Sequence, residues 1–382
     1  MAVGHFIFSE THETLRAEIR RYVERELAPH ADEWEAAEYF PDSVFWEMGR
    51  LGYLGLRYPE EYGGSGLDYY SAIVLAEELS RAGAGGVGMA LAVHAEMATP
   101  PVLKFGTEEQ KRKFLVPAIA GKQIAALAIT EPGAGSDVSG IRTSAALTDG
   151  QWVLNGSKLY ITNGIRADWY VVLARTGDDQ WGGLTLFLVE KGMPGFAVGR
   201  KLKKLGMHAS DTAELFFENV LLPDANRLGD VGQGFYNIMW ELQGERLIGA
   251  AAAVAGAERS LELAVEYARQ REAFGRSIGK FQVIRHKLAQ MATEIEAARS
   301  LVYTCAWRWE NGEYPVKEIS MAKLFASEVA CRVADEALQI HGGAGYMADM
   351  PIGRHWRDAR LLRIGAGTDE IMREVISRQM GF

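Results

Sequence analysis

The sequence predicts an α+β multidomain protein in which a β domain lies between two all-helical domains. Three zones of different hydrophobic pattern carry this prediction. Residues 1–122 show helical periodicity, residues 123–232 show short apolar runs separated by Gly, Asn and Asp, and residues 233–382 show long helical periodicity. Because 382 residues are enough for two or three domains, we take these ranges as the expected domains.

The first zone is typical of amphipathic helices. In TLRAEIRRYVEREL the apolar residues Leu15, Ile19, Val23 and Leu27 follow one another at intervals of four, which places one apolar stripe on a charged helix. YYSAIVLAEELSRA predicts a further helix. TEEQKRKFLVPAIA predicts another, with acidic residues in its first turn.

The two later zones differ from each other in period. QWVLNGSKLYITN, WYVVLART, LTLFLVEKGMPG and ELFFENVLLP predict strands and turns. In the last zone apolar residues alternate three and four apart, which is the period of helices packed side by side. These residues are Phe281, Ile284, Leu288, Met291, Ile295, Ala298, Val302, Cys305 and Trp309. Small residues in IGAAAAVAGAE allow close helix approach, so we expect a helical bundle.

Composition argues against several classes of protein. The net charge of -9 is opposite to the basic stripe of a nucleic-acid binder and to a polybasic membrane surface. No apolar run approaches the roughly 20 residues of a membrane span. The start MAVGHFIFSE lacks a basic segment followed by a long apolar one, so we expect no secretory signal and a cytoplasmic protein. Cys305 and Cys331 fall in helical patterns and are expected to be reduced core thiols.

Two familiar site types are not expected. GAGGVG, residues 83–88, matches the dinucleotide fingerprint G-x-G-x-x-G, but it follows a helical pattern instead of a strand. We therefore interpret it as a helix-terminating loop. The histidines form no H-E-x-x-H pair, and no metal site is expected.

Three glycine- and hydroxyl-rich segments are the candidate ligand-binding elements. They are ITEPGAGSD, YITNG and QIHGGAGY. In YITNG, regular strand alternation would place Tyr160 and Thr162 on one face. Each segment alone is an ordinary turn more often than a site. Together they supply an aromatic ring, hydroxyls and bare backbone N–H groups, which suit a flat heterocycle that carries a diphosphate.

The order and spacing of these motifs resemble the acyl-CoA dehydrogenase family over essentially the whole chain. The motifs that carry the resemblance are ITEPGAGSDVSGIRT, YITNG, QREAFGRSIGKFQ, QIHGGAGYMADMPIGRHWRDAR and GAGTDEI. The resemblance implies an N-terminal helical domain, a middle β domain of barrel-like or sandwich form, and a C-terminal four-helix bundle. It also implies one FAD per subunit and a homo-oligomer, usually a tetramer.

The resemblance also implies which residues bind FAD. Ile129 and Thr130 are expected to touch the flavin ring, Tyr160 to stand behind it, and Thr162 to approach its N5 atom. The remaining expected FAD contacts are Leu127, Gly135 and Ser136; Arg271, Phe274 and Gln282, which would reach the FAD of a neighbouring subunit; Gln339, Gly342 and Gly343 near the diphosphate; and Thr368 and Glu370 on the adenosine and diphosphate side.

The terminal loop lacks the base that most of the family uses. In most members the loop is Tyr-Glu-Gly-Thr, and its glutamate removes the α-proton of the acyl-CoA. Here the aligned residues are Gly365, Ala366, Gly367 and Thr368. Alanine cannot accept a proton, although the backbone N–H of Ala366 can still serve as the oxyanion donor to the thioester oxygen. Either the base lies elsewhere or the chain is inactive at that step.

Glu245, in WELQGERLIGAAAA, is the predicted catalytic base. The isovaleryl-type and long-chain-type members lack the loop glutamate and carry the base on the helix that bears this Glu-Arg pair. Burial beside an acyl chain should raise its pKa from about 4.3 toward neutrality. The alternative is a surface glutamate that pairs with Arg246. Asp369, Glu370 and Glu131 are weaker candidates for the base.

The implied substrate is a saturated acyl-CoA, bound by Ser136, Leu242, Arg246, Gly365 and Gly367. The small loop residues resemble the isovaleryl type and favour a branched chain. GRKLKKLGMHASDTAELFFENVLLP, GFYNIMWELQGERL and TDEIMREVI are closer to the long-chain type. A medium-to-long or branched acyl group is therefore expected, on CoA or on a carrier protein.

The implied reaction gives a trans-2-enoyl-CoA. Glu245 would take the pro-R α-proton, flavin N5 the β-hydride, and an electron-transferring flavoprotein would then receive the electrons. One alternative is an oxygen-using acyl-CoA oxidase or flavin monooxygenase on the same fold, which rapid reoxidation by air would reveal. Another is a non-catalytic FAD-binding scaffold, which no acyl-CoA would bleach.

Overall fold

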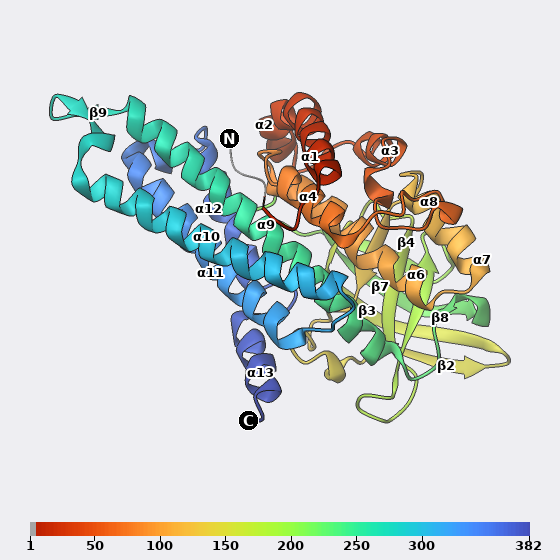
Figure 1. The fold of residues 1–382 in the computed structure, drawn as a ribbon. Helices are drawn as coiled ribbons and strands as arrows, with labels where there is room; N and C mark the ends of the chain where they lie inside the picture. Colours follow the sequence, from red (N-terminus) through yellow and green to blue (C-terminus); the bar gives the residue numbers. More distant parts are fainter. Residues whose placement is uncertain (1–4) are drawn as a thin grey trace.

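A computed structural model describes residues 5–382 and contains helical, sheet and helical regions in chain order (Figure 1). Long helices of the C-terminal region lie on one side of the molecule, the sheet lies on the other, and the N-terminal helices pack against both. The predicted order of an all-helical, a β and an all-helical region is therefore confirmed. None of the helices in the described part of the chain is long and apolar enough to cross a membrane.

The N-terminal region is a set of short helices. Their bounds are α1 (Glu10–Tyr22), α2 (Ala31–Ala37), α3 (Ser43–Arg50), α4 (Tyr69–Leu79), α5 (Gly85–Ala92), α6 (Thr99–Phe105), α7 (Glu108–Gln110) and α8 (Val116–Ile119). The stripe predicted on the first helix is largely buried, with Ile19, Val23 and Leu27 in the core. The prediction of a loop over residues 83–88 is correct only for its first residues and wrong for the rest. Only the turn around Gly83 (φ +78°) is a loop, and the chain re-enters a helix at Gly85.

The middle region is one mixed eight-stranded sheet with strand order β6-β7-β3-β2-β4-β5-β8 and with β1 beside β4. Its strands are β1 (Ala125–Ala128), β2 (Ser144–Thr148), β3 (Gln151–Thr162), β4 (Trp169–Arg175), β5 (Leu184–Glu190), β6 (Phe196–Lys201), β7 (Thr212–Pro223) and β8 (Arg227–Leu228). Strand β4 is buried over six of its seven residues because β1 and β5 flank it and helices cover it. The four runs predicted as strands all form strands.

The C-terminal region consists of three long helices and two short ones. They are α9 (Gly234–Gln270), α10 (Gln282–Glu310), α11 (Val316–His341), α12 (Pro351–Ala359) and α13 (Asp369–Gln379), with the hairpin β9 (Glu272–Ala273) and β10 (Arg276–Ser277) between α9 and α10. The central part of the stripe predicted on α10 is buried and its ends are partly buried. Both cysteines are free thiols, and burial raises the pKa of Cys305 to about 12.

Helix α4 holds the central part of α9 in place through hydrogen bonds at both ends of α4. The Tyr69 hydroxyl donates to the Gly244 carbonyl (3.0 Å), and the Ser80 hydroxyl donates to the Ala252 carbonyl (3.2 Å). Small buried residues of α9 pack closely on α11. This docking fixes the register of the segment that contains Glu245.

Candidate active site

Glu245 lies on α9 in a partly buried position between two cations. Burial raises the pKa of its carboxyl to about 7, while the charges of Arg246 and Lys323 act in the opposite direction. A carboxylate with such a pKa is ionised in a large fraction of molecules near neutrality and is basic enough to accept a proton there. The position therefore has the electrostatics of a general base.

The terminal loop is fastened beside this carboxylate through its backbone. The Arg246 guanidinium Nε donates to the Ala366 carbonyl at 3.0 Å, and the Lys323 Nζ donates to the Gly367 carbonyl at 2.5 Å. Thr368 then caps α13, where its hydroxyl accepts the Ile371 N–H at 3.4 Å. The structure thus brings the Glu-Arg pair of α9 and the predicted oxyanion loop into one site.

The weaker candidates for the base are in settings that do not favour proton abstraction. Asp369 accepts from the Arg363 Nε at 2.6 Å. The Glu370 side chain is exposed, and the pKa of its carboxyl is lowered by its own backbone N–H and by the Thr368 hydroxyl. Glu131 is buried but accepts from Lys158 (2.8 Å).

Glu241, one helical turn before Glu245, is a site residue that the sequence reasoning missed. Its side chain is 2% exposed, and neither carboxyl oxygen has a hydrogen-bond partner among residues 5–382. Burial and the charge of Glu245 raise the pKa of Glu241 well above its ordinary value, while Arg246 opposes them. The spacing of four residues in WELQGERL could have revealed it, because residues i and i+4 share a helix face.

Several residues expected at the flavin ring lie together where β1 ends beside β3. The Leu159 N–H donates to the Thr130 carbonyl at 2.8 Å, and the Lys158 Nζ donates to the Ile129 carbonyl at 2.9 Å. A β-bulge between Lys158 and Ile161 breaks the regular alternation on which the shared face of Tyr160 and Thr162 was predicted. Tyr160 has φ +62° and is 65% exposed.

Helix α9 reaches this edge of the sheet through Leu242. Leu242 lies in one apolar cluster with Leu127 and Ile129 of the β1 segment. Gly135 and Ser136 lie in the exposed turn that follows. The helix that carries Glu245 and the expected flavin-binding edge are therefore neighbours in the structure.

Six of the expected FAD contacts lie at the far end of the helical bundle. Arg271 directly follows the last residue of α9 and comes 26 residues after Glu245, so the two are separated by about 39 Å along the helix axis. The ends of α9 and α11 are adjacent, because Tyr267 stacks on His341 with ring centroids 4.4 Å apart. The six residues at this end are Arg271, Phe274, Gln282, Gln339, Gly342 and Gly343. One chain does not bring them to the site around Glu245.

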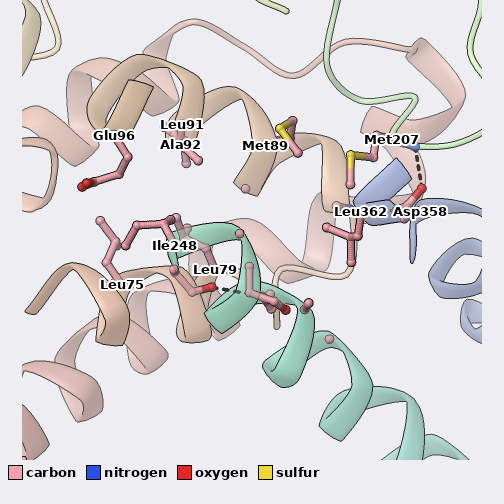
Figure 2. A pocket seen from close by; sticks show the side chains of 18 of the residues that line it. Leu75, Leu79, Met89, Leu91, Ala92, Glu96, Met207, Ile248, Asp358 and Leu362 are labelled. Atoms are coloured by element: carbon pink, nitrogen blue, oxygen red, sulfur yellow. Dashed lines mark hydrogen bonds between the residues drawn. The ribbon is translucent and has the colours of Figure 1, made fainter. Parts of the chain in front are cut away.

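An elongated apolar cavity lies between α4, α5 and α9 (Figure 2). Leu75, Leu79, Leu91 and Ile248 project into it, and Leu362 lies toward its far end with Met207 and Asp358. On α9 it is lined by Ile248, Gly249, Ala252, Ala253, Gly256 and Ser260. Since Ile248 and Gly249 come three and four residues after Glu245, the cavity begins one helical turn from the carboxylate and follows the same helix face.

Three family models match consecutive parts of the chain. The acyl-CoA dehydrogenase N-terminal domain matches residues 9–122, the middle domain residues 126–220, and the C-terminal domain residues 232–381. The chain is 46% identical to an acyl-CoA dehydrogenase of Bacillus subtilis (strain 168), over 96% of this chain and 97% of that protein. It is 43% identical to the mitochondrial long-chain specific acyl-CoA dehydrogenase of Sus scrofa, over 98% and 87% of the two chains. It is also 43% identical to the mitochondrial isovaleryl-CoA dehydrogenase of Oryza sativa subsp. japonica, over 99% and 93%.

Solved structures agree with these matches. An acyl-CoA dehydrogenase from Geobacillus kaustophilus superposes with a TM-score of 0.94 and 42% identity, covering 98% of this chain and 99% of that one. A structure described as electron transferring flavoprotein of Acidaminococcus fermentans gives a TM-score of 0.96 and 43% identity over 99% and 100%. An acyl-CoA dehydrogenase from Bacillus anthracis, solved in complex with FAD, superposes with a TM-score of 0.93 and 36% identity. The match covers 98% of this chain and 67% of that one.

Proposed function

Because the chain belongs to the acyl-CoA dehydrogenase family, we propose that it is an FAD-dependent enzyme that oxidises a saturated acyl-CoA to the trans-2-enoyl-CoA with Glu245 as the base. The observation that carries this proposal is the position of Glu245. It is a carboxylate with a pKa of about 7, on the helix that also fastens the terminal loop. Ala366 contributes its backbone N–H to the thioester oxygen, and the base comes from α9.

The residues at the β1 and β3 edge fit a flavin. Tyr160 presents an uncovered aromatic ring, and the residues Thr130 and Thr162 are partly exposed at the same edge. A flat ring with polar edges suits this combination. When bound, FAD supplies the acceptor for the β-hydride, and the protein places the α-proton within reach of Glu245. A second copy of the chain would bring Arg271, Phe274 and the other far-end residues to this FAD, so we propose a homo-oligomer.

The cavity favours a long acyl chain. From Ile248 to Ser260 it follows α9 for twelve residues, or about 18 Å. Carbon–carbon bonds of about 1.5 Å advance roughly 1.25 Å per atom in an extended chain, which leaves room for about 14 carbons beyond the thioester region. Its walls are mostly aliphatic side chains and glycines. We therefore propose a long straight acyl group in preference to a branched short one.

Two glycines of α9 support this proposal. Gly249 and Gly256 line the cavity, and a Cβ at either position would meet no atom within 4 Å. Glycine within a helix is less stable than alanine by about 0.5–1 kcal/mol. No close packing requires glycine here, so the residues serve the width of the cavity.

Anaerobic titration of the purified holoenzyme with acyl-CoAs from isovaleryl to palmitoyl tests the proposal. We expect long-chain thioesters to bleach the flavin absorbance of the wild type, and Glu245→Gln to bind them without bleaching. Gly256→Leu should abolish bleaching by palmitoyl-CoA and leave hexanoyl-CoA effective. If isovaleryl-CoA is the best substrate, or if Gly256→Leu does not alter the chain-length profile, the long-chain assignment is wrong.

The electron acceptor is tested in the same preparation. We propose that an electron-transferring flavoprotein is the electron acceptor. This is supported by a solved structure whose description names such a flavoprotein and which contains a chain 43% identical to this one. Slow reoxidation of the bleached enzyme in air, with fast reoxidation by added electron-transferring flavoprotein, would support a dehydrogenase. Fast reoxidation by oxygen alone would favour the oxidase or monooxygenase alternative.

A further inference from the structure

The loop beside Glu245 has an unusual backbone. Ala366 has φ +56° and Gly367 has φ +98°. The left-handed region suits glycine, but residues with a Cβ seldom adopt it. Such a conformation persists when the surrounding structure holds it, and it often occurs where a backbone group must point in one direction.

Two buried cations hold this conformation. Arg246 of α9 is 4% exposed and donates to the Ala366 carbonyl, and Lys323 of α11 is 3% exposed and donates to the Gly367 carbonyl. Charge-assisted bonds of this kind are stronger than bonds between neutral groups. The two bonds come from two different helices, so together they fix two successive peptide planes.

The Ala366 N–H lies on the peptide plane that precedes these two and is joined to them through the Ala366 Cα. No protein group within residues 5–382 accepts the Ala366 N–H. This N–H is the predicted oxyanion donor. A donor on a restrained loop that has no competing partner is available to stabilise a developing oxyanion.

Lys323 also lies among the charges of the site. It is surrounded by Asp369, which is paired with Arg363, and by Arg246 and Glu245. Burial lowers the pKa of Lys323 to about 8, while Asp369 and Glu245 act in the opposite direction. When it is protonated, the site holds two cations, Lys323 and Arg246, around one ionised base. This excess of positive charge suits a negatively charged thioester enolate.

We infer that Lys323 is a positioning residue for the reaction, which holds the Ala366 N–H at the thioester oxygen and provides positive charge beside the enolate. The inference rests on the proposed function. It concerns a residue that neither binds FAD nor takes the proton, and it assigns a purpose to a buried lysine on the side of α11 that faces the terminal loop.

The test compares Lys323→Met with Lys317→Met, the same change at a more exposed lysine of α11. Both are assayed as holoenzymes. One readout is the rate of flavin reduction by a saturating acyl-CoA. The other is the apparent pKa for enolate formation by a bound 3-thia-acyl-CoA, whose sulfur acidifies the α-proton and replaces the carbon that would lose hydride. We expect Lys323→Met to slow reduction about 100-fold, to change KM little and to raise the enolate pKa by at least one unit.

A second measurement does not depend on the folding of Lys323→Met. In the wild type, flavin reduction should decline as the pH rises through about 8, where Lys323 loses its proton. Lys323→Arg stays charged and should move that decline to higher pH. Unchanged reduction and enolate pKa in Lys323→Met, or an unchanged alkaline limb in Lys323→Arg, would overturn the inference. Failure of the proposed function is seen earlier, because acyl-CoA would then leave the wild-type flavin oxidised or would bleach Glu245→Gln equally fast.

Discussion

Buried carboxylates of the middle sheet and of α9 are treated in opposite ways. Glu131 accepts hydrogen bonds from the Lys158 ammonium (2.8 Å), the Arg142 N–H (2.8 Å) and the Thr143 N–H (3.0 Å). Burial alone would raise the pKa of Glu131, but these donors bring it below the ordinary value. Glu241 is more deeply buried than Glu131, and both its oxygens lack a partner among the described residues.

The different numbers of hydrogen-bond donors indicate different roles for Glu131 and for the carboxyls of α9. A buried carboxylate with three donors ties the turn after β1 to β2 and β3, and its charge is neutralised where it stands. A buried carboxyl next to a partly buried one, with few donors for either, is unfavourable for folding, yet it provides a group whose pKa lies near neutrality. Donors therefore balance the charge of Glu131 in the middle sheet, whereas the carboxyls of α9 have few donors, as the proposed reaction requires of a base.

The largest expected effect is the loss of flavin reduction in Glu245→Gln. General-base catalysis contributes about 10²–10⁴-fold, and we expect the rate with the best acyl-CoA to fall by about 10³-fold or more. Glu131→Gln should keep its rate within about tenfold of the wild type when it is assayed as holoenzyme. Stopped-flow reduction under anaerobic conditions measures both. Equal losses in the two variants would remove the distinction between the two carboxylates.

The next effect concerns stability. Lys158→Met leaves Glu131 buried without its cation, and breaking a buried ion pair from one side costs about 3–5 kcal/mol. We expect a similar decrease in the free energy of unfolding by urea. Lys317→Met is the control, and it should change stability by less than about 0.5 kcal/mol because its partner is partly exposed.

A smaller effect is the change in stability when Glu241 of α9 or Glu131 of the sheet region is replaced, and its pH dependence differs between the two. Glu241→Met removes a buried unpartnered carboxyl, so it should stabilise the protein by about 1–3 kcal/mol. Because the pKa of Glu241 is raised in the folded protein, its carboxyl destabilises the fold increasingly as the pH rises above the unfolded pKa, and the gain in Glu241→Met should be larger at pH 8 than at pH 5.

Glu131→Met is the matched control for that measurement. The pKa of Glu131 is lowered in the folded protein, so its stabilising contribution is present above its unfolded pKa and is lost as the pH falls. The substitution should therefore destabilise the protein at both pH 5 and pH 8, because both values lie above the unfolded pKa of about 4.3, and the loss should fade only below about pH 4. Urea unfolding of both variants at the two pH values shows the signs directly. If both substitutions changed the free energy of unfolding in the same direction, the contrast between the two carboxyls would be wrong.

Sequence reasoning predicted the fold well because each zone has its own hydrophobic period. The stripe on α10 and the strand runs of the sheet are local patterns, and tertiary packing agrees with them. Prediction from sequence failed where the same local pattern is compatible with two conformations. The glycines of residues 83–88 are consistent with either a loop or a helix, and packing of α5 against its neighbours decided for a helix from Gly85 onward.

The site was predictable only where a motif carries it. Glu245 and Ala366 stand in recognisable motifs, and their roles remain predictions. Glu241 and Lys323 were missed, because their importance depends on what surrounds them and not on residue type. A bulge that places Tyr160 at φ +62° also follows from strand pairing with β7, which a single strand does not encode.

The smallest effect extends the comparison from charges to the backbone of α9. If α9 keeps unfavourable features for the sake of the site, Gly256→Ala should raise the free energy of unfolding by about 0.5–1 kcal/mol, since helical glycine is replaced and the new methyl group meets no atom within 4 Å. The same methyl group narrows the cavity, so the rate with palmitoyl-CoA should fall while the rate with hexanoyl-CoA holds. Thermal unfolding and a chain-length series measure the two effects on one preparation. A stability gain without any change in the chain-length series would mean that the glycine does not serve the acyl chain, and the unpaired carboxyls of α9 would then be the only feature that distinguishes it from the sheet.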